Sequence, residues 1–280
     1  MNDRSPVWFI SGASSGLGRA LAEAVLERGW RAVVTARRPD SLSDFSRRYG
    51  ERALLLPLDV TDPASIDRAV EAARSRFGTI DVLANCAGYG YLAAIEEGED
   101  REIRNQFEVN VFGLNALTKR VLPGMRQQRR GHIFNFSSLG GLVAFAATGY
   151  YHATKFAVEA LSESLSHEVA PLGIRVTLVE PGAFRTDWAG RSMVESATVI
   201  DDYAETAGKR RAATRAVSGK QPGDPARAAQ AIIAAYEAGE PPLRLLLGSI
   251  ALKVALARLD ALRENFEAWA DTTKSADFPA

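Results

Sequence analysis

The chain lacks the features that mark secreted, membrane-spanning or nucleic-acid-binding proteins. Its one cysteine, Cys86, cannot form an internal disulfide, so the fold does not depend on an oxidising compartment. With 34 basic and 34 acidic residues the net charge is zero, whereas binding nucleic acid requires a basic excess. The N-terminus lacks the apolar core of a signal peptide, and no apolar run of about 20 uncharged residues exists. We therefore expect a cytoplasmic protein with no membrane span and no nucleic-acid partner.

Short apolar runs alternate with longer stretches of helical spacing. Apolar residues suited to both faces of a strand, separated by helices, indicate a parallel sheet covered on both sides. The predicted fold class is α/β, a doubly wound Rossmann fold with about seven parallel strands. We expect strands at 7–11, 32–36, 53–58, 81–84, 132–136, 175–179 and 243–247. We expect helices at 19–28, 63–77, 101–122, 151–170 and 226–238.

Two segments stand outside this alternation, and no linker-like tract or internal repeat divides the rest. We therefore predict one domain over 1–248, in which 184–224 is polar with scattered apolar anchors. Residues 249–280 form a C-terminal helical extension with an amphipathic pattern. The other face of that helix carries both charge signs, which favours packing on the body or on a partner subunit over a membrane surface. Its apolar residues are Leu252, Leu256, Leu259, Leu262, Phe266 and Trp269.

A glycine-rich segment follows the first strand and opens the first helix. Glycines let the backbone turn tightly and approach a pyrophosphate without clashes of Cβ atoms. The N-terminus of the helix offers free N–H groups and the positive end of its dipole to the anion. Because a strand and a helix flank the loop in the right order, we predict a dinucleotide site rather than a simple turn. The expected contacts are Gly12, Ser14, Ser15, Gly16, Leu17 and Gly18.

The end of the second strand bears on the choice of dinucleotide. An acidic residue there would bind the ribose 2′-hydroxyl of NAD, but this chain has Ala36 followed by Arg37 and Arg38. Two guanidinium groups suit a 2′-phosphate, which they bind in a bidentate fork. The alternative is a pair of solvated loop arginines. We predict NADP(H) as the cofactor, with an NAD-linked alcohol dehydrogenase as the alternative.

A tyrosine and a lysine lie four residues apart on a predicted helix. Tyr151 and Lys155 therefore share one face of it, and a nearby cation favours the phenolate and lowers the pKa of the tyrosine. A phenol so tuned can give a proton to a ketone oxygen or take one from an alcohol. By itself, a tyrosine and a lysine at this spacing often occur by chance. Ser138, near the end of the fifth strand, supports the catalytic interpretation because ligands bind at the carboxyl ends of parallel strands.

Further marks stand in a fixed order along the chain. A Ser-Gly-x-x-x-Gly-x-Gly run at 11–18 is followed by Asp59 and Val60, by Asn85, Cys86, Ala87 and Gly88, by Asn110, by Ser138, Tyr151 and Lys155, and by Pro181, Gly182 and Thr186. With these marks the chain resembles the short-chain dehydrogenase/reductase family over 6–248. It departs from the family pattern at Ser11, where the family has threonine, and at Cys86, where it has a second asparagine. We interpret Cys86 as a packed small residue.

The resemblance implies hydride transfer between a nicotinamide and a carbonyl or secondary alcohol, with no metal. It assigns the oxygen of the substrate to Ser138, the proton to Tyr151 and the nicotinamide ribose to Lys155, which would also lower the pKa of Tyr151. Asn110 would position a water that resupplies the proton. The remaining cofactor contacts would be Asp59, Val60, Asn85, Ala87, Gly88, Pro181, Gly182 and Thr186, besides Tyr151 and Lys155.

The substrate is expected to be a small apolar ketone, aldehyde or alcohol, with reduction as the favoured direction. Residues 184–224 would form a substrate loop, and the apolar wall would include Tyr89, Tyr91, Leu142, Phe145, Phe184, Trp188 and Met193, each of which could equally be a core residue. The resemblance also implies a homodimer or homotetramer through the helices at 101–122 and 151–170. A non-catalytic nucleotide-sensing protein is a further alternative, although the Ser-Tyr-Lys set is intact.

Overall fold

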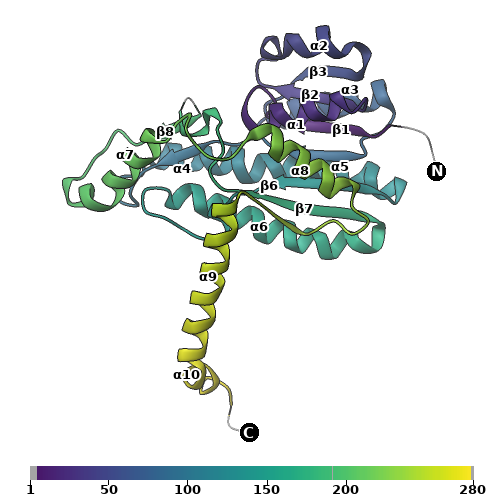
Figure 1. Ribbon diagram of the computed structural model, residues 1–280. Helices are drawn as coiled ribbons and strands as arrows, with labels where there is room; N and C mark the ends of the chain where they lie inside the picture. The colour runs from purple at the N-terminus through teal and green to yellow at the C-terminus, as the bar shows by residue number, and fades with distance from the viewer. Residues whose placement is uncertain (1–4, 191, 279–280) are drawn as a thin grey trace.

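A parallel sheet of seven strands forms the centre of the molecule (Figure 1). The computed structural model describes residues 5–190 and 192–278. The strand order, β3-β2-β1-β4-β6-β7-β9, confirms the predicted doubly wound fold. The chain starts at β1, moves outward to β3 and then continues on the other side of β1, which creates a switch point between β1 and β4. The strands are β1 (Val7–Ser11), β2 (Arg31–Ala36), β3 (Ala53–Pro57), β4 (Val82–Asn85), β6 (Gly131–Phe136), β7 (Ile174–Pro181) and β9 (Arg244–Leu247).

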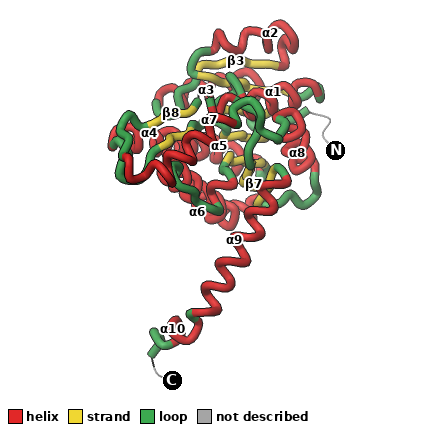
Figure 2. The backbone as a smooth tube through the Cα atoms, turned by 60° about the vertical axis from the view of Figure 1, so that its left-hand side comes forward, coloured by secondary structure: helices red, strands yellow, loops and turns green. Residues whose placement is uncertain are grey.

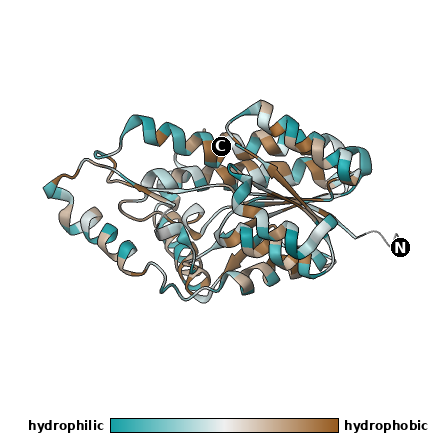
Figure 3. Cartoon of the chain, turned by 90° about the horizontal axis from the view of Figure 1, so that it is seen from above, coloured by the Kyte–Doolittle hydropathy of each residue, from teal (hydrophilic) through white to brown (hydrophobic). Residues whose placement is uncertain are grey.

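Helices cover both faces of the sheet because its strands are apolar on both sides. In β1, Trp8 and Ile10 pack with α1 and α8, whereas Val7 and Phe9 pack with α3 and α5 on the opposite face. Figure 3 shows hydrophobic strands between helices whose outer sides are hydrophilic. The covering helices are α1 (Gly16–Glu27), α2 (Ser43–Tyr49), α3 (Pro63–Phe77), α5 (Leu114–Gln128), α6 (Gly149–Val169) and α8 (Pro225–Glu237).

The helix expected at 101–122 is longer and less regular than predicted. It comprises α4 (Asp100–Phe107), a π-helical segment (Glu108–Gly113) and α5, which continues through Pro123 to Gln128. The last turn persists because Met125 is fully buried beneath it in the core. Arg129, in the left-handed conformation, then ends the helix.

Some elements were not predicted at all. A two-stranded sheet pairs β5 (Gly90–Leu92) with β8 (Met193–Glu195), and α7 (Lys209–Ala216) lies in the predicted substrate loop. The C-terminal extension forms α9 (Ser249–Ala268) and α10 (Ala270–Lys274), as its amphipathic pattern predicts. Within residues 5–190 and 192–278, no helix has both the length and the apolar character that crossing a membrane requires.

A histidine buried in the sheet predicts a dependence of stability on pH. His132 is 3% exposed, stacks on Phe134 with ring centroids 4.0 Å apart, and shares a hydrogen bond of 2.9 Å with Thr177. Burial lowers its pKa from 6.5 to about 3, and the guanidinium of Arg175 acts in the same direction. The unfolded chain therefore binds more protons than the folded protein between these pH values, and stability falls as the pH falls through that range.

His132→Gln removes this group and is expected to flatten the curve of unfolding free energy against pH. The expected change of slope is about 1.4 kcal/mol per pH unit in the range where only the unfolded state is protonated. Denaturant unfolding at a series of pH values measures the slope in both proteins. His152, whose pKa burial lowers to about 4, is present in both and cancels in the comparison. Parallel curves for the two proteins would contradict the prediction.

Candidate active site

The predicted site residues come together at the carboxyl ends of the strands on either side of the switch point. Gly12 follows β1. Asn85 is the last residue of β4, and residues 86–88 follow it. Ser138 comes shortly after β6. Tyr151 and Lys155, on α6, are both buried beside these segments. This edge is where ligands bind in open parallel sheets.

Gly12 and Ser11, at the start of the glycine loop (residues 12–18), both lie close to the loop after β4. Gly12 has a φ of 67°, and a methyl group on it would lie 2.7 Å from Cα of Ala87. The hydroxyl of Ser11 accepts hydrogen bonds from the N–H groups of Cys86 at 3.1 Å and Ala87 at 3.2 Å. The serine that replaces the family's threonine thus ties the loop after β1 to the loop after β4.

The N-terminus of α1 is open toward an anion. Ser15 precedes the helix, but its side chain makes no capping hydrogen bond, and the first turn contains no acidic residue. Gly16 has a φ of 60°, and a methyl group on it would meet only Thr186, at 3.5 Å. The loop, the free N–H groups and Thr186 therefore border the same space, which fits a pyrophosphate.

Arg37 and Arg38 are exposed at the end of β2. Across the residues the structure describes, neither guanidinium makes an ion pair or a hydrogen bond. Nearby, Asp59 accepts hydrogen bonds from Thr61, which hold its pKa below the usual range, and the charge of Arg37 adds to this effect. Two cations and one carboxylate thus flank the end of β2.

Lys155 is held within the site by one strong contact. Its ammonium donates a hydrogen bond of 2.7 Å to the carbonyl of Phe136 and lies 5.7 Å from the centre of the Tyr151 ring. Burial lowers the pKa of Lys155 to about 8, although the charge of Glu159 opposes that change. A methyl group on Gly88 would lie 3.7 Å from Nζ of Lys155, so the ammonium also faces the loop after β4.

The pKa of Tyr151 shifts in the opposite direction from the prediction. Burial raises it to about 12, and a hydrogen bond with Ser138 lowers it only in part. The phenol is 7% exposed, and its desolvation outweighs the charge of Lys155 on which the prediction was based. Tyr151 is therefore a neutral phenol at neutral pH.

Asn110 lies in the π-helical segment, a distortion that is frequent at functional sites. Its side chain accepts a hydrogen bond from the N–H of Tyr89 at 3.1 Å and donates to the Tyr89 carbonyl at 3.0 Å and to Thr154 at 3.1 Å. Thr154 in turn donates to the carbonyl of Tyr151 at 2.7 Å. Thr154 was not predicted, and its position beside Lys155 on a buried helical face is the signal that could have identified it.

The comparisons with known proteins agree with this geometry. The family model described as short chain dehydrogenase matches residues 6–195, more than half of the chain. The chain belongs to the short-chain dehydrogenase family.

Full-length relatives are found among both sequences and structures. Oxidoreductase BOA17 of Botryotinia fuckeliana is 40% identical over 264 residues, which span 94% of this chain and 96% of that protein. A 3-ketodihydrosphingosine reductase of Bacteroides thetaiotaomicron is 41% identical over 199 residues, 71% of each chain. The crystal structure of a short-chain dehydrogenase from Streptomyces avermitilis is 43% identical and aligns with a TM-score of 0.93 over 99% of this chain and 100% of its own.

Solved structures of this fold include complexes with both dinucleotides. A short chain dehydrogenase from Burkholderia cenocepacia in complex with NADP is 27% identical, with a TM-score of 0.74 over 96% of this chain and 98% of its own. One from Burkholderia phymatum in complex with NAD is 24% identical, with a TM-score of 0.83 over 95% and 96%. The family therefore accounts for an oxidoreductase with a nicotinamide cofactor and leaves the choice of NAD or NADP open.

Asn85, which was predicted to contact the cofactor, also makes structural contacts in this short-chain dehydrogenase. Its side chain is 2% exposed and donates to Thr118 at 2.9 Å and to Asn135 at 2.8 Å. It therefore braces β4, β6 and α5 beneath the site. Cys86 packs against the core, as predicted, and burial raises the pKa of its thiol. Val60 fits closely against Gly113, on which a methyl group would lie 2.7 Å from Cγ2 of Val60.

The predicted apolar wall divides into pocket and core residues. The ring of Trp188 lies 5.1 Å from that of Tyr151, and a methyl group on Gly90 would lie 2.8 Å from both Trp188 and Met193. Tyr91 is instead fully buried, and its hydroxyl accepts a hydrogen bond from the N–H of Glu99. Phe184 packs against the core of the α1 face. Trp188 is therefore the wall residue that lies against the phenol, and Met193 lies beside Trp188 at Gly90.

An ion pair and hydrogen bonds hold the substrate loop against the segment that follows β5. Glu97 is 3% exposed and forms an ion pair with the buried Arg211 of α7. It also accepts a hydrogen bond from the N–H of Ile200 at 2.9 Å, and its carbonyl accepts one from Ser196 at 2.6 Å. These contacts place the part of the loop around β8 beside Gly90 and the site.

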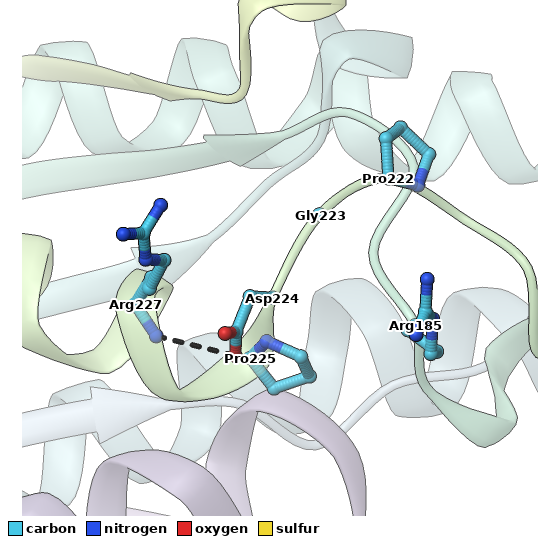
Figure 4. Close-up of a pocket in the computed structure, with 6 residues that line it drawn as sticks. All are labelled: Arg185, Pro222, Gly223, Asp224, Pro225 and Arg227. Carbon is cyan, nitrogen blue, oxygen red and sulfur yellow. Dashed lines mark hydrogen bonds between the residues drawn. The ribbon is translucent and has the colours of Figure 1, made fainter.

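A hollow of about 540 Å³ opens where the segment after β7 meets the start of α8 (Figure 4). In it Asp224 caps α8 by accepting a hydrogen bond from Arg227, and Arg185 donates to the carbonyl of Gln221 at 3.3 Å. The lining is polar and contains none of the predicted wall residues, so the hollow is distinct from the apolar pocket that the sequence predicts. It is lined by Arg185, Pro222, Gly223, Asp224, Pro225 and Arg227.

Proposed function

We propose that this short-chain dehydrogenase is an NADP(H)-dependent reductase of apolar ketones or aldehydes. The main support for this proposal is that Tyr151, Lys155 and Ser138 lie together beside an open glycine loop. Oxidation of NADPH with formation of an alcohol from an apolar ketone is the result that tests the proposal.

The cofactor would lie along the carboxyl edge of the sheet. The N–H groups at Ser14 to Leu17 would bind its pyrophosphate, and Asp59 with Val60 would border the adenine. Thr186 would hold the carboxamide, with Pro181 and Gly182 shaping that segment. Lys155 would bind the nicotinamide ribose. These assignments rest on the two close glycine contacts and on the uncapped N-terminus of α1.

The side chains would act on the oxygen of the substrate. When bound, the reduced nicotinamide supplies a hydride to the carbonyl carbon. Ser138 would donate a hydrogen bond to the carbonyl oxygen, and Tyr151 would give it the proton as general acid. Lys155 would stabilise the tyrosinate that remains, and Asn110 would hold the path by which the proton is replaced.

The protonation of Tyr151 is compatible with a role as general acid in reduction. A pKa of about 12 keeps the phenol protonated at neutral pH, which is the form that a reductase needs at the start of its cycle. The protonated phenol is thus the form available to a reductase at the start of its cycle.

The surroundings of the phenol favour an apolar substrate. Trp188 faces it from the substrate loop, with Met193 beside Gly90, and Phe145 packs on the adjacent His152 with ring centroids 5.5 Å apart. The relative from Bacteroides thetaiotaomicron is named for the reduction of a keto group on a sphingoid chain, which supports an apolar ketone here. We propose a ketone with a long aliphatic or an aromatic substituent.

Replacing both arginines after β2 tests the choice of NADP. In the Arg37→Ala, Arg38→Ala double variant, KM for NADPH is expected to rise about 10²–10⁴-fold, because charge-assisted hydrogen bonds contribute about 1.5–3 kcal/mol each and two are lost. KM for NADH is expected to stay unchanged. Arg47→Ala removes an exposed arginine on α2 and serves as control. Equal losses with both cofactors, or a wild-type preference for NADH, would overturn the assignment.

We also propose assembly through the α4–α6 face. Phe112 is 55% exposed, and on α6 Phe156 is 45% and Leu161 43% exposed. Large apolar side chains gathered on neighbouring helices suit a subunit interface. The expected product is a homodimer or homotetramer.

A further inference from the structure

Helix α9 leaves the rest of the molecule after its first turns (Figures 1 and 2). Ala251 and Ala255 are buried against the turn Leu139–Gly141 and its apolar neighbours. Further along, the apolar side chains face solvent: Leu259 is 61% exposed, Phe266 65% and Trp269 61%. A helix of 20 residues is about 30 Å long, so this stripe extends beyond the reach of the body. Of the two packing surfaces that the sequence suggested, the body of the chain covers only the base of the helix.

The exposed stripe has the spacing of a coiled-coil seam. Every seventh residue is a large apolar one, and each of these is followed three residues later by a second apolar residue. The first series is Leu252, Leu259 and Phe266, and the second is Leu262 and Trp269; Ala255, seven residues before Leu262, belongs to the base that the body covers. A seam of this kind fits another helix with the same repeat, because side chains then interlock at matching intervals.

We propose that α9 pairs antiparallel with α9 of a second copy of this chain. With the twofold axis between Leu259 and Leu262, each of these residues meets the other one of the second copy. The same register places Leu252, which is 51% exposed, opposite Trp269. The smaller leucine thus faces the larger tryptophan across the seam. The contact is closed, because a twofold axis uses the same surface of both copies.

The charges along the helix favour the antiparallel direction. The part up to Arg263 carries three basic residues and one acidic residue, whereas the next turns carry three acidic residues. In this register an antiparallel pair brings Lys253 of one helix near Glu267 of the other, while Arg258 and Arg263 meet near its centre; a parallel pair would oppose like charges along the whole helix. The acidic turns also disfavour an anionic membrane surface. The residues are Lys253, Arg258, Asp260 and Arg263, followed by Glu264, Glu267 and Asp271.

The extension is shared with a solved relative. The alignment with the Streptomyces avermitilis structure covers 99% of this chain and 100% of that one, so it includes α9. A helix that projects in both proteins is consistent with a common role for its exposed stripe.

Cysteine cross-linking tests both the pairing and its direction. Leu252→Cys and Trp269→Cys are prepared as separate proteins, mixed, allowed to exchange subunits and oxidised. The antiparallel register predicts a disulfide-linked dimer in the mixture and none in either protein alone. Wild type, with only Cys86, is the control. Cross-linking of each variant with itself would overturn the antiparallel register, and no cross-linking in any sample would overturn the pairing.

The mass in solution supplies an independent readout. Leu259→Glu places a charge in the seam and is expected to halve the mass measured by light scattering, whether or not the α4–α6 face also associates. Ala257→Glu adds the same charge on the opposite face of α9 and is expected to keep the wild-type mass. Far-UV circular dichroism checks that both variants fold. An unchanged mass for Leu259→Glu, or sedimentation of wild type but not of Leu259→Glu with phosphatidylcholine vesicles, would overturn the proposal.

Discussion

Tyr151→Phe is expected to lower kcat about 10²–10⁴-fold, the contribution typical of a general acid. The phenylalanine keeps the ring in its place against Trp188 and removes only the hydroxyl that would protonate the substrate. The dissociation constant for NADPH is expected to stay nearly unchanged, because the pyrophosphate loop and the arginines after β2 are untouched. Stopped-flow oxidation of NADPH and fluorescence titration measure the two quantities separately.

Tyr150→Phe is the matched control for this substitution. Tyr150 precedes Tyr151 on α6, but its hydroxyl donates to the carbonyl of Ile95 at 2.6 Å and takes no part in the site. We expect its kcat to remain close to wild type. A Tyr151→Phe enzyme that kept its activity, or a Tyr150→Phe enzyme that lost as much, would refute the role of Tyr151.

Ser138→Ala is expected to lower kcat about 10²–10³-fold, as the loss of one hydrogen-bond donor to a developing oxyanion does. In the structure its hydroxyl accepts a hydrogen bond from the N–H of Gly140 at 3.0 Å, which orients it, and also contacts the phenol of Tyr151. The alanine enzyme should therefore lose both the donor to the substrate and the hydrogen bond that lowers the pKa of Tyr151. Steady-state kinetics of the alanine and wild-type enzymes measures the loss of kcat.

The neighbouring serine provides the control. Ser137 is 3% exposed and its hydroxyl has no hydrogen-bond partner among the described residues, so Ser137→Ala removes a buried polar atom that contributes nothing to the site. We expect near wild-type kcat and equal or slightly higher stability for Ser137→Ala. Equal losses of activity in the two alanine variants would show that the turn after β6, rather than the hydroxyl of Ser138, is what the reaction needs.

The sheet and the residues at its carboxyl edge could be predicted because their signals are local. Apolar runs flanked by helical spacing identified the strands, and Gly12, Ser138 and Tyr151 stand at fixed distances from them. The short strands β5 and β8 carry no such signal, since each has three residues and they pair across about 100 positions of the chain. Contacts of Glu97 with Ile200 and Arg211 also hold this region, and only the folded chain brings these residues together.

The other differences between prediction and structure depend on burial and packing, which a single sequence does not reveal. The pKa of Tyr151 is set by burial, and burial depends on how closely the substrate loop and α6 pack over it. Tyr91 was predicted as a wall residue because aromatic side chains suit a pocket. It is instead buried in the core, where its hydroxyl accepts a hydrogen bond from the backbone N–H of Glu99. The amphipathic pattern of α9 predicted the helix, but not that the body would cover only its base.

The most direct measurement is turnover of NADPH and NADH with a panel of ketones and aldehydes of increasing apolar character, with the alcohol product quantified. The account predicts stoichiometric oxidation of NADPH, a kcat/KM that rises with the apolar substituent, and a clear preference for NADPH over NADH. Stoichiometric binding of NADPH with no oxidation across the whole panel would contradict it and would indicate a protein that senses the nucleotide without turnover.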